Sequence, residues 1–537
     1  MRPASTRSYA EPTLAILGGG LLFFLRFGYD YGRGDQDEFL PLVLHHLDTS
    51  LLARDWFVQT QVEGIGIRTY FAGLVEALAS LMPLWLAVLL LYVLTWIALG
   101  GAVYALAHRL TGDRMAAILT VLGALVLTPQ WTLGGNDLAH RLLVPSMVAW
   151  ALGLWGLTAF FNRRILWAAV LLGIATWMQA LVGLHLALLV TALLLVALFP
   201  REHRPLARRN LLLFAGVFAA SAAPALGPLV YQHVHPPPLP AGDLVSPFYI
   251  QAVFRAPHHY LPDAFPLPAV LSFGLIAGAG LLAFSFPQVR KLLTAPRETG
   301  LLLLFITLAC LIGYLFTTVW PVFFIVKLQL FKTTVLAKLL FVLILSATVS
   351  RLMPTFLWRS AARWLAGPWP SFMALAGWTI VCVGLITGNP FIRSRALPWE
   401  HEKTPMAQLE RWIRTQTPTE AIVAVPPSWD GFRTRARRAI VVNFKAFPFR
   451  EDHMQGWYRR LLDMAPIAPP ERGGAALLPL LDEAYEQLPA GALLERSERY
   501  GFSYVVRQTP LPSSHSFERV FQAEPWVVYR IRPREDR

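Results

Sequence analysis

The chain has 537 residues, of which 55% are hydrophobic and 15% are charged, whereas soluble proteins average roughly 45–50% and 25%. Together with a mean hydropathy of +0.48, this composition excludes a disordered chain, a fibrous protein and a large soluble enzyme, and it indicates several membrane spans. The net charge of +14 would favour a nucleic-acid partner in a soluble protein, but the placement of the charges argues against one here. Both cysteines lie in apolar stretches, so neither a disulfide framework nor a cysteine metal cluster is predicted.

Apolar runs long enough to cross a bilayer, roughly 17–25 residues, recur along the first 389 residues. We expect eleven spans, at 12–29, 84–105, 115–131, 141–161, 165–181, 183–199, 211–231, 268–286, 301–319, 333–350 and 371–388. The stretch 165–199 could also be one broken unit, and three lysines (Lys327, Lys332 and Lys338) interrupt the pattern around the tenth span. The predicted fold is mainly α, a polytopic membrane helix bundle of about 11 spans.

Basic residues fall on every second connection between these runs, as they do on the cytoplasmic side of membrane proteins. They occur within 2–7, 109–114, 163–164, 201–209, 290–297 and 351–363. The N-terminus is therefore predicted to be cytoplasmic, and an odd number of spans places the C-terminal part outside. The first run is interpreted as a retained helix, because no small-residue cleavage site follows it.

Residues 390–537 differ in composition from the transmembrane domain 1–389: they hold 22 basic and 18 acidic residues and no apolar run of spanning length. Periodicity predicts an amphipathic helix at 405–416, strands at 421–425, 440–444, 503–507 and 526–531, and helices at about 452–464, 477–488 and 491–500. Gly501 is a plausible helix stop. This pattern predicts an extracytoplasmic α/β domain of roughly 140 residues.

Acidic residues concentrate in the loop between the first two spans, 30–82. Of the 15 acidic residues in 1–389, eight lie there: Asp30, Asp35, Asp37, Glu38, Asp48, Asp55, Glu63 and Glu76. The densest point is Gly34-Asp35-Gln36-Asp37-Glu38, followed by an amphipathic stretch at 39–47. A carboxylate can act as a general base towards a hydroxyl, and carboxylates among glycines can converge on a divalent cation. An acidic turn that caps the next helix would give the same local pattern.

This arrangement resembles the GT-C superfamily of polytopic glycosyltransferases, which take sugars from polyprenyl-phosphate carriers. In that fold a first helix leads into a long extracytoplasmic loop with an Asp or an Asp-Glu pair, and further spans and an outer C-terminal domain follow. Here Asp35 and the pair Asp37-Glu38 occupy the matching positions. The chain is also similar to uncharacterised bacterial membrane proteins with a Gly-Asp-Gln-Asp-Glu stretch and an Arg-x-Pro-His-His stretch.

The resemblance implies transfer of a sugar from a polyprenyl-phosphate donor to an extracytoplasmic acceptor at the bacterial inner membrane. Asp35, Asp37 or Glu38 would then be the base, or would orient the acceptor through a divalent cation; which of the three corresponds to the superfamily's catalytic residue stays open. GT-C enzymes often carry a second acidic residue in the second outer loop, where this chain has Asp137 and, near it, His140. That loop could equally be an interfacial segment with Trp131 as its anchor.

Two further groups on the predicted outer face are candidates for binding. Arg255, His258 and His259 lie in a Pro-rich loop, either as a pocket rim for a sugar or phosphate or as part of a rigid lid; their spacing does not match a zinc site. Lys327 and Lys332 could neutralise the phosphate of a lipid-linked donor, or their ammonium groups could extend to the membrane interface.

The tail holds a cluster of four arginines (Arg433, Arg435, Arg437 and Arg438), interpreted either as an anion site or as a solvated basic edge. The sequence has no P-loop and no dinucleotide fingerprint, as expected for a donor activated on a lipid. Two other hypotheses are a transporter or flippase, which predicts paired half-domains and charges within helices, and a non-catalytic membrane protein. In the latter, removal of the three clustered carboxylates would change only stability.

Overall fold

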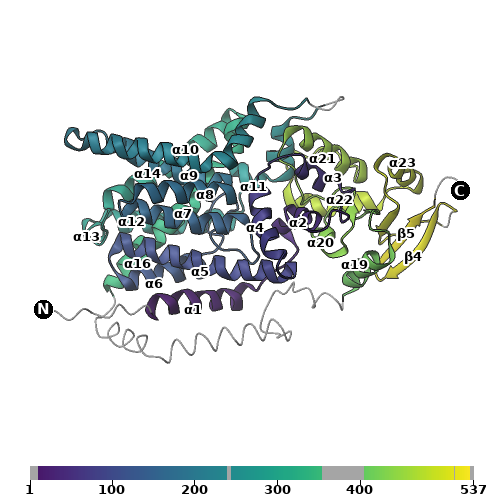
Figure 1. The fold of residues 1–537 in the computed structure, drawn as a ribbon, viewed down its shortest axis with the longest axis horizontal. Coiled ribbons are helices and arrows are strands. Elements are labelled where there is room, and N and C mark those ends of the chain that lie inside the picture. The colour runs from purple at the N-terminus through teal and green to yellow at the C-terminus, as the bar shows by residue number, and fades with distance from the viewer. Residues whose placement is uncertain (1–9, 239–243, 353–403, 513–514, 533–537) are drawn as a thin grey trace. The chain divides into compact units, whose positions relative to one another are not determined.

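The computed structural model describes residues 10–238, 244–352, 404–512 and 515–532 (Figure 1). The chain divides into two compact units, and each is described by itself. The first unit comprises residues 1–29, 90–226 and 258–395, and the second comprises 30–89, 227–257 and 396–537. The second unit therefore combines the acidic loop, part of the Pro-rich loop and the C-terminal tail.

Helices form at ten of the eleven predicted spans, and the eleventh, at 371–388, lies outside the described residues. The ten positions are occupied by α1 (Ala10–Phe27), α5 (Leu84–Thr111), α6 (Arg114–Leu122), α7 (Pro145–Phe161), α8 (Ile165–Met178), α9 (Ala180–Val196), α10 (Arg204–Val234), α12 (Leu267–Ser285), α14 (Pro296–Tyr314) and α16 (Thr334–Leu352). Within the described residues, five stretches are long and apolar enough to cross a membrane: Leu84–Thr111, Arg204–Val234, Leu267–Ser285, Pro296–Val319 and Phe323–Leu352. The protein is therefore a mainly helical membrane protein, and the count of eleven spans stays a prediction.

Burial distinguishes central helices from peripheral ones in the first unit. In the stretch that contains α16, 67% of the residues of its most apolar 18-residue window are buried. The corresponding shares are 17% in α10 and 11% in α12, so these two helices leave most of their apolar surface uncovered. Helices α7, α8 and α9 are apolar on all sides, which is typical of helices enclosed in a bundle or facing lipid. Short elements precede α16: α15 (Phe323–Lys327) and the 3₁₀ turn η7 (Leu330–Thr333).

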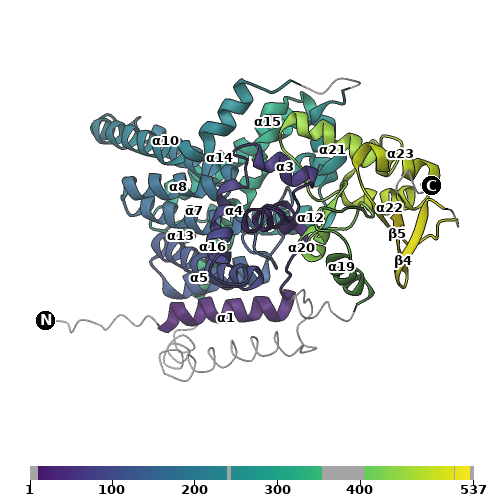
Figure 2. The same ribbon diagram turned by 45° about the vertical axis from the view of Figure 1, so that its right-hand side comes forward.

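A five-stranded sheet lies in the tail part of the second unit, in the order β2-β1-β3-β5-β4. Strands β1 (Ile422–Ala424), β2 (Ala439–Ile440) and β3 (Tyr504–Arg507) are parallel, and β5 (Trp526–Ile531) runs antiparallel to both β3 and β4 (Phe517–Ala523). The β4–β5 hairpin is the yellow pair of arrows in Figures 1 and 2. Three of the predicted strands are confirmed, as β1, β3 and β5, whereas the strand predicted at 440–444 is reduced to the two residues of β2. The edge strand β4 was not predicted; most of its residues are not buried, so it has no simple apolar pattern.

The helices of this tail begin and end close to their predicted bounds. They are α19 (Pro405–Gln416), α20 (Phe432–Ala436), α21 (Glu451–Met464), α22 (Leu478–Glu486) and α23 (Ala490–Tyr500), of which only α20 was not predicted. The core between the helices and the sheet contains Leu409, Ile413, Val423, Phe432 and Val506. Helix α23 ends at Gly501, which adopts a left-handed conformation (φ 70°) and fits the predicted helix stop.

The acidic loop folds together with this tail. It forms the 3₁₀ turn η1 (Gly34–Glu38), α2 (Leu40–Leu47), α3 (Trp56–Val62) and α4 (Thr69–Ala79). Figure 1 shows α2 and α3, in purple, beside the green helices α20 and α21. The backbones approach closely at one point: Gly431 has φ +73°, and a Cβ there would lie 1.7 Å from the carbonyl oxygen of Gly32.

We expect Gly431→Ala to lower the free energy of unfolding by about 2 kcal/mol or more, because alanine adds both a left-handed strain and a clash with Gly32. Denaturant or thermal unfolding of the purified protein measures this. Gly491→Ala in α23 is the control, because nothing lies within 4 Å of a Cβ there and the helix should tolerate alanine. Equal stability of the two variants would contradict the close loop–tail contact.

Candidate functional site

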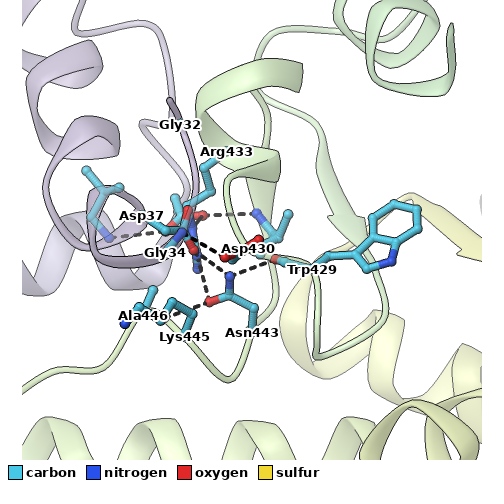
Figure 3. Close-up of polar contacts among 12 residues, drawn as sticks. Gly32, Gly34, Asp37, Trp429, Asp430, Arg433, Asn443, Lys445 and Ala446 are labelled. Carbon is cyan, nitrogen blue, oxygen red and sulfur yellow. Dashed lines mark hydrogen bonds and ion pairs between the residues drawn. The ribbon is translucent and has the colours of Figure 1, made fainter. Parts of the chain in front are cut away.

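Asp37 lies in a buried polar network at the junction of the acidic loop and the tail, within the second unit (Figure 3). The side-chain amide of Asn443 donates to Asp37 Oδ2 (2.6 Å) and to the carbonyl oxygen of Trp429 (2.9 Å). Arg433 Nη1 lies 3.7 Å from the same carboxylate oxygen. The other oxygen, Oδ1, is buried and has no hydrogen-bond partner among the described residues.

Arg433 joins Asp37 to a second buried carboxylate, Asp55. Its Nε donates to Asp55 Oδ2 (2.8 Å), and its Nη1 donates to Asn443 Oδ1 (3.0 Å). Asp55 also accepts from the backbone N–H of Val58, as the N-cap of α3, and from that of Ile440 in β2. One guanidinium thus serves two carboxylates, with all three side chains no more than 1% exposed. Such buried networks are costly to break at a single partner.

The environment of Asp37 opposes its charged form. Burial raises the pKa of this carboxyl group, and the nearby guanidinium of Arg433 and the hydrogen bond from Asn443 offset the rise only in part. Asp37 therefore ties the loop to the tail, and its side chain is not open to an acceptor in solution.

The next acidic residue, Glu38, is also engaged inside the unit. Arg68 donates from Nε to Glu38 Oε2 (3.1 Å) and forms a second, shorter contact with the same oxygen through Nη2. Burial disfavours the charge of Arg68, but the carboxylates of Glu38 and Asp35 outweigh it and raise the pKa of the guanidinium. Glu38 is 7% exposed at its side chain, so it too is positioned for a structural role.

Asp35 differs from its two neighbours because its side chain is 44% exposed. It forms an ion pair with Lys445, whose side chain is 29% exposed and comes from the tail. Arg255 lies next to this pair: its Nη2 donates to the carbonyl oxygen of Lys445 (2.8 Å), and its guanidinium packs over the ring of Phe444. The structure thus brings Asp35 and Arg255, two of the predicted site residues, to the same short tail segment.

The three clustered carboxylates do not converge. Asp35 contacts Lys445, Asp37 contacts Arg433 and Glu38 contacts Arg68. Among the described residues there is no group of three His, Cys, Asp or Glu side chains that could hold a metal ion. The arrangement of Asp35, Asp37 and Glu38 therefore does not fit the divalent-cation site that the sequence analysis considered for them.

In the first unit, Asp137 is a buried partner of Lys338. Lys338 in α16 is 0% exposed at its side chain, pairs with Asp137 Oδ1, and donates to the carbonyl oxygen of Thr128 (3.0 Å). Asp137 also accepts from the backbone N–H of Leu138. Lys338 was not among the predicted site residues, although a lone lysine in the apolar run 333–350 was a signal for a buried partner.

His258 and His259 pack on the glycine turn Gly134-Gly135, in the loop that also carries Asp137. His259 Nδ1 lies 2.7 Å from the carbonyl oxygen of Gly134, and the two imidazole rings are 4.1 Å apart. Gly135 has φ +63°, and a Cβ there would lie 2.9 Å from the ring of His258. The two histidines therefore pack against the loop that carries Asp137. His140 contributes its backbone carbonyl, which accepts from the hydroxyl of Tyr92.

Lys327 and Lys332 lie in the short elements before α16. Lys327 is half-buried, with its ammonium group over the ring of Phe323 (4.5 Å). Lys332 is only 5% exposed and is therefore enclosed by protein rather than extended outwards. His185, from α9, lies against the same segment, with Nε2 2.8 Å from the carbonyl oxygen of Leu328.

The arginine cluster of the tail is largely internal, so the interpretation as a solvated basic edge is wrong for most of it. Arg433 is buried as described, and Arg435 Nε donates to both carboxylate oxygens of Glu410 (2.8 and 2.9 Å). Arg438 is 5% exposed and donates to the hydroxyl of Thr417. Arg437 alone of the four is exposed.

Comparisons with known proteins show the fold but not a family. A family model described as "Domain of unknown function (DUF6798)" matches residues 404–464. No curated protein matches the chain. The crystal structure of ArnT from Cupriavidus metallidurans, bound to undecaprenyl phosphate, is similar with a TM-score of 0.50 and 14% identity, over 96% of this chain and 97% of that one. This likeness supports the GT-C-like fold predicted from the sequence.

Because burial raises the pKa of Asp37 in the folded protein, the folded state binds this proton more tightly than the unfolded chain. The contribution of Asp37 to stability is therefore fully present at acid pH and falls as the pH rises from about 3.9, the unfolded value, through the raised folded pKa. Asp37→Asn should remove this loss of stability with rising pH, because asparagine does not titrate. The unfolding free energy of the Asn variant minus that of wild type should therefore grow as the pH rises. A difference that shrinks as the pH rises would contradict the raised pKa of Asp37.

Lys338→Met should destabilise the first unit by about 3–5 kcal/mol, because it leaves Asp137 charged, buried and without its cation. Adding Asp137→Asn should recover part of that loss. Lys291→Met, at an exposed position, is the control and should change stability by less than about 0.5 kcal/mol. Thermal unfolding in detergent compares the four proteins, and a single Lys338 variant as stable as the control would refute the pairing.

Proposed function

We propose that this protein is a membrane glycosyltransferase that moves a sugar from a polyprenyl-phosphate donor to an acceptor outside the cytoplasm. The observation that carries the proposal is the fold likeness to ArnT with undecaprenyl phosphate bound, which extends over nearly the whole of both chains. We also propose the topology that the basic residues predict, with a cytoplasmic N-terminus, the acidic loop and residues 390–537 outside, and residence in the bacterial inner membrane.

Asp35 is the proposed base. A general base must reach the acceptor, and the exposed side chain of Asp35 meets this condition, whereas those of Asp37 and Glu38 are buried. The carboxylate of Asp35 takes the proton of an acceptor hydroxyl, whose oxygen bonds to the anomeric carbon of the sugar. The bond from that carbon to the phosphate oxygen breaks, and polyprenyl phosphate leaves with the bonding pair.

Residues of the first unit are proposed to bind the donor. Lys327, which is half-buried, would contact the phosphate of the lipid, because a cation stabilises the charge that develops on a leaving phosphate. Lys332 is enclosed by protein, so its positive charge would act on the phosphate from a distance rather than by contact. Asp137, through its pair with Lys338, would hold the shape of the outer loop on which His258 and His259 pack.

We expect Asp35→Asn to reduce sugar transfer by about 100-fold or more, the usual range for loss of a positioned base. The assay combines purified protein, a panel of radiolabelled polyprenyl-phosphate sugars and membrane extract as the source of acceptor. Asp48→Asn is the matched control, because Asp48 is an exposed carboxylate of the same loop whose contacts are to Ser50.

A wild-type protein that neither transfers sugar nor binds any donor would overturn the proposal. Movement of intact donor across vesicles without transfer would instead support the transporter hypothesis. Full transfer by Asp35→Asn would remove Asp35 from the mechanism and leave the reaction class standing.

A further inference from the structure

We infer that Lys445, supplied by the segment 404–464, is a positioning residue for Asp35: its ammonium group holds this carboxylate in place. The inference rests on the proposed function, because it assigns a role within that reaction to a part of the chain outside the predicted membrane domain.

The contact between Asp35 and Lys445 is partly open to solvent. The two side chains are 44% and 29% exposed. Ion pairs this exposed contribute little to stability, because water screens them and two flexible side chains must be ordered. A role in folding therefore does not account for the pair, and the chemistry of Asp35 offers a reason for it.

The backbone on the tail side of the pair is fixed from two directions. Asn443, two residues before Lys445, is fully buried, and its side-chain oxygen accepts from the N–H of Ala446 (3.1 Å). The carbonyl oxygen of Lys445 itself accepts from Arg255, whose guanidinium packs over Phe444. Figure 3 shows Asn443, Lys445 and Ala446 on one short segment facing the acidic loop.

The backbone on the loop side is fixed as well. The N–H of Gly34 donates to Asp430 Oδ2 (2.7 Å), and the N–H of Gly32 donates to the side chain of Gln36 (2.6 Å). Asp37, two residues after Asp35, accepts from Asn443, two residues before Lys445. The buried Asp37–Asn443 contact therefore aligns the two strands of chain that carry Asp35 and Lys445.

This arrangement suits a base. An adjacent cation favours the charged form of a carboxylate, which is the form that accepts a proton. Asp35 is faced by the ammonium group of Lys445 and by the guanidinium of Arg68. The ammonium group is a compact cation with three donors on a flexible stem, and it contacts Oδ1 of Asp35. The acceptor's proton goes to the carboxylate of Asp35, and Lys445 takes no part in this proton transfer.

The test compares the pH dependence of transfer by wild type, Lys445→Met and Lys445→Arg. Lys445→Met should lower kcat about 10-fold, change KM by less than about 2-fold, and move the acid limb of the kcat profile to higher pH. Lys445→Arg should return the acid limb to its wild-type position, because arginine keeps the cation. Arg450→Met is the control: it removes another loop–tail ion pair, the one with Glu63, and should leave the acid limb in place.

Thermal unfolding of the same proteins separates this role from a structural one. The Tm of Lys445→Met should stay within about 2 °C of wild type. If wild type is active and the acid limb of the kcat profile is unchanged in Lys445→Met, this inference is overturned and the proposed function stands. The same holds if the activity of Lys445→Met falls only as far as its Tm falls. A wild type without transfer activity would overturn the proposed function and this inference with it.

Discussion

The second unit depends on one buried guanidinium, that of Arg433, between the carboxylates of Asp37 and Asp55. An arginine side chain is charged at any physiological pH, so it cannot lose its proton to escape burial, and it must keep its carboxylate partners. Asp55 caps α3 and Asp37 lies in the turn η1, so the first half of the acidic loop is bound to the tail at two points. The loop and the tail are consequently parts of one folded unit.

This constraint determines which carboxylates can do chemistry. A cluster of acidic residues in a sequence suggests several equivalent bases, but three of those in the loop are occupied by cations within the fold: Asp37, Asp55 and Glu38. Their burial gives the loop its position. Asp35 keeps partial solvent access, and its partner Lys445 is itself only partly buried. Burial thus assigns structural roles to Asp37, Asp55 and Glu38, and the proposed chemical role falls to their neighbour Asp35.

The helices and most of the tail could be predicted, because apolar runs and amphipathic periods are local properties of the sequence. The amphipathic helix α19 and strand β1 are examples.

The partners of the charged side chains could not be predicted in this way. Arg433 and Asp55 are separated by 378 positions, and no spacing rule connects them; the solvated-edge interpretation failed for this reason. The same applies to Lys338 and Asp137, which are 201 positions apart. An isolated lysine in an apolar helix does indicate that a buried partner exists, but it does not indicate which residue that partner is. Strand β4 was missed because most of its residues are not buried.

Carboxyl footprinting tests the central claim most directly, namely that Asp35 is the accessible carboxylate of the cluster while Asp37 and Asp55 are locked around Arg433. The folded protein is treated with a carbodiimide and an amine nucleophile, and the labelled positions are found by mass spectrometry as a function of time. The account predicts rapid labelling of Asp35, slowed by a polyprenyl-phosphate donor with acceptor, and negligible labelling of Asp37 and Asp55 until the protein unfolds. Labelling of Asp37 or Asp55 in the folded protein as fast as Asp35 would contradict it.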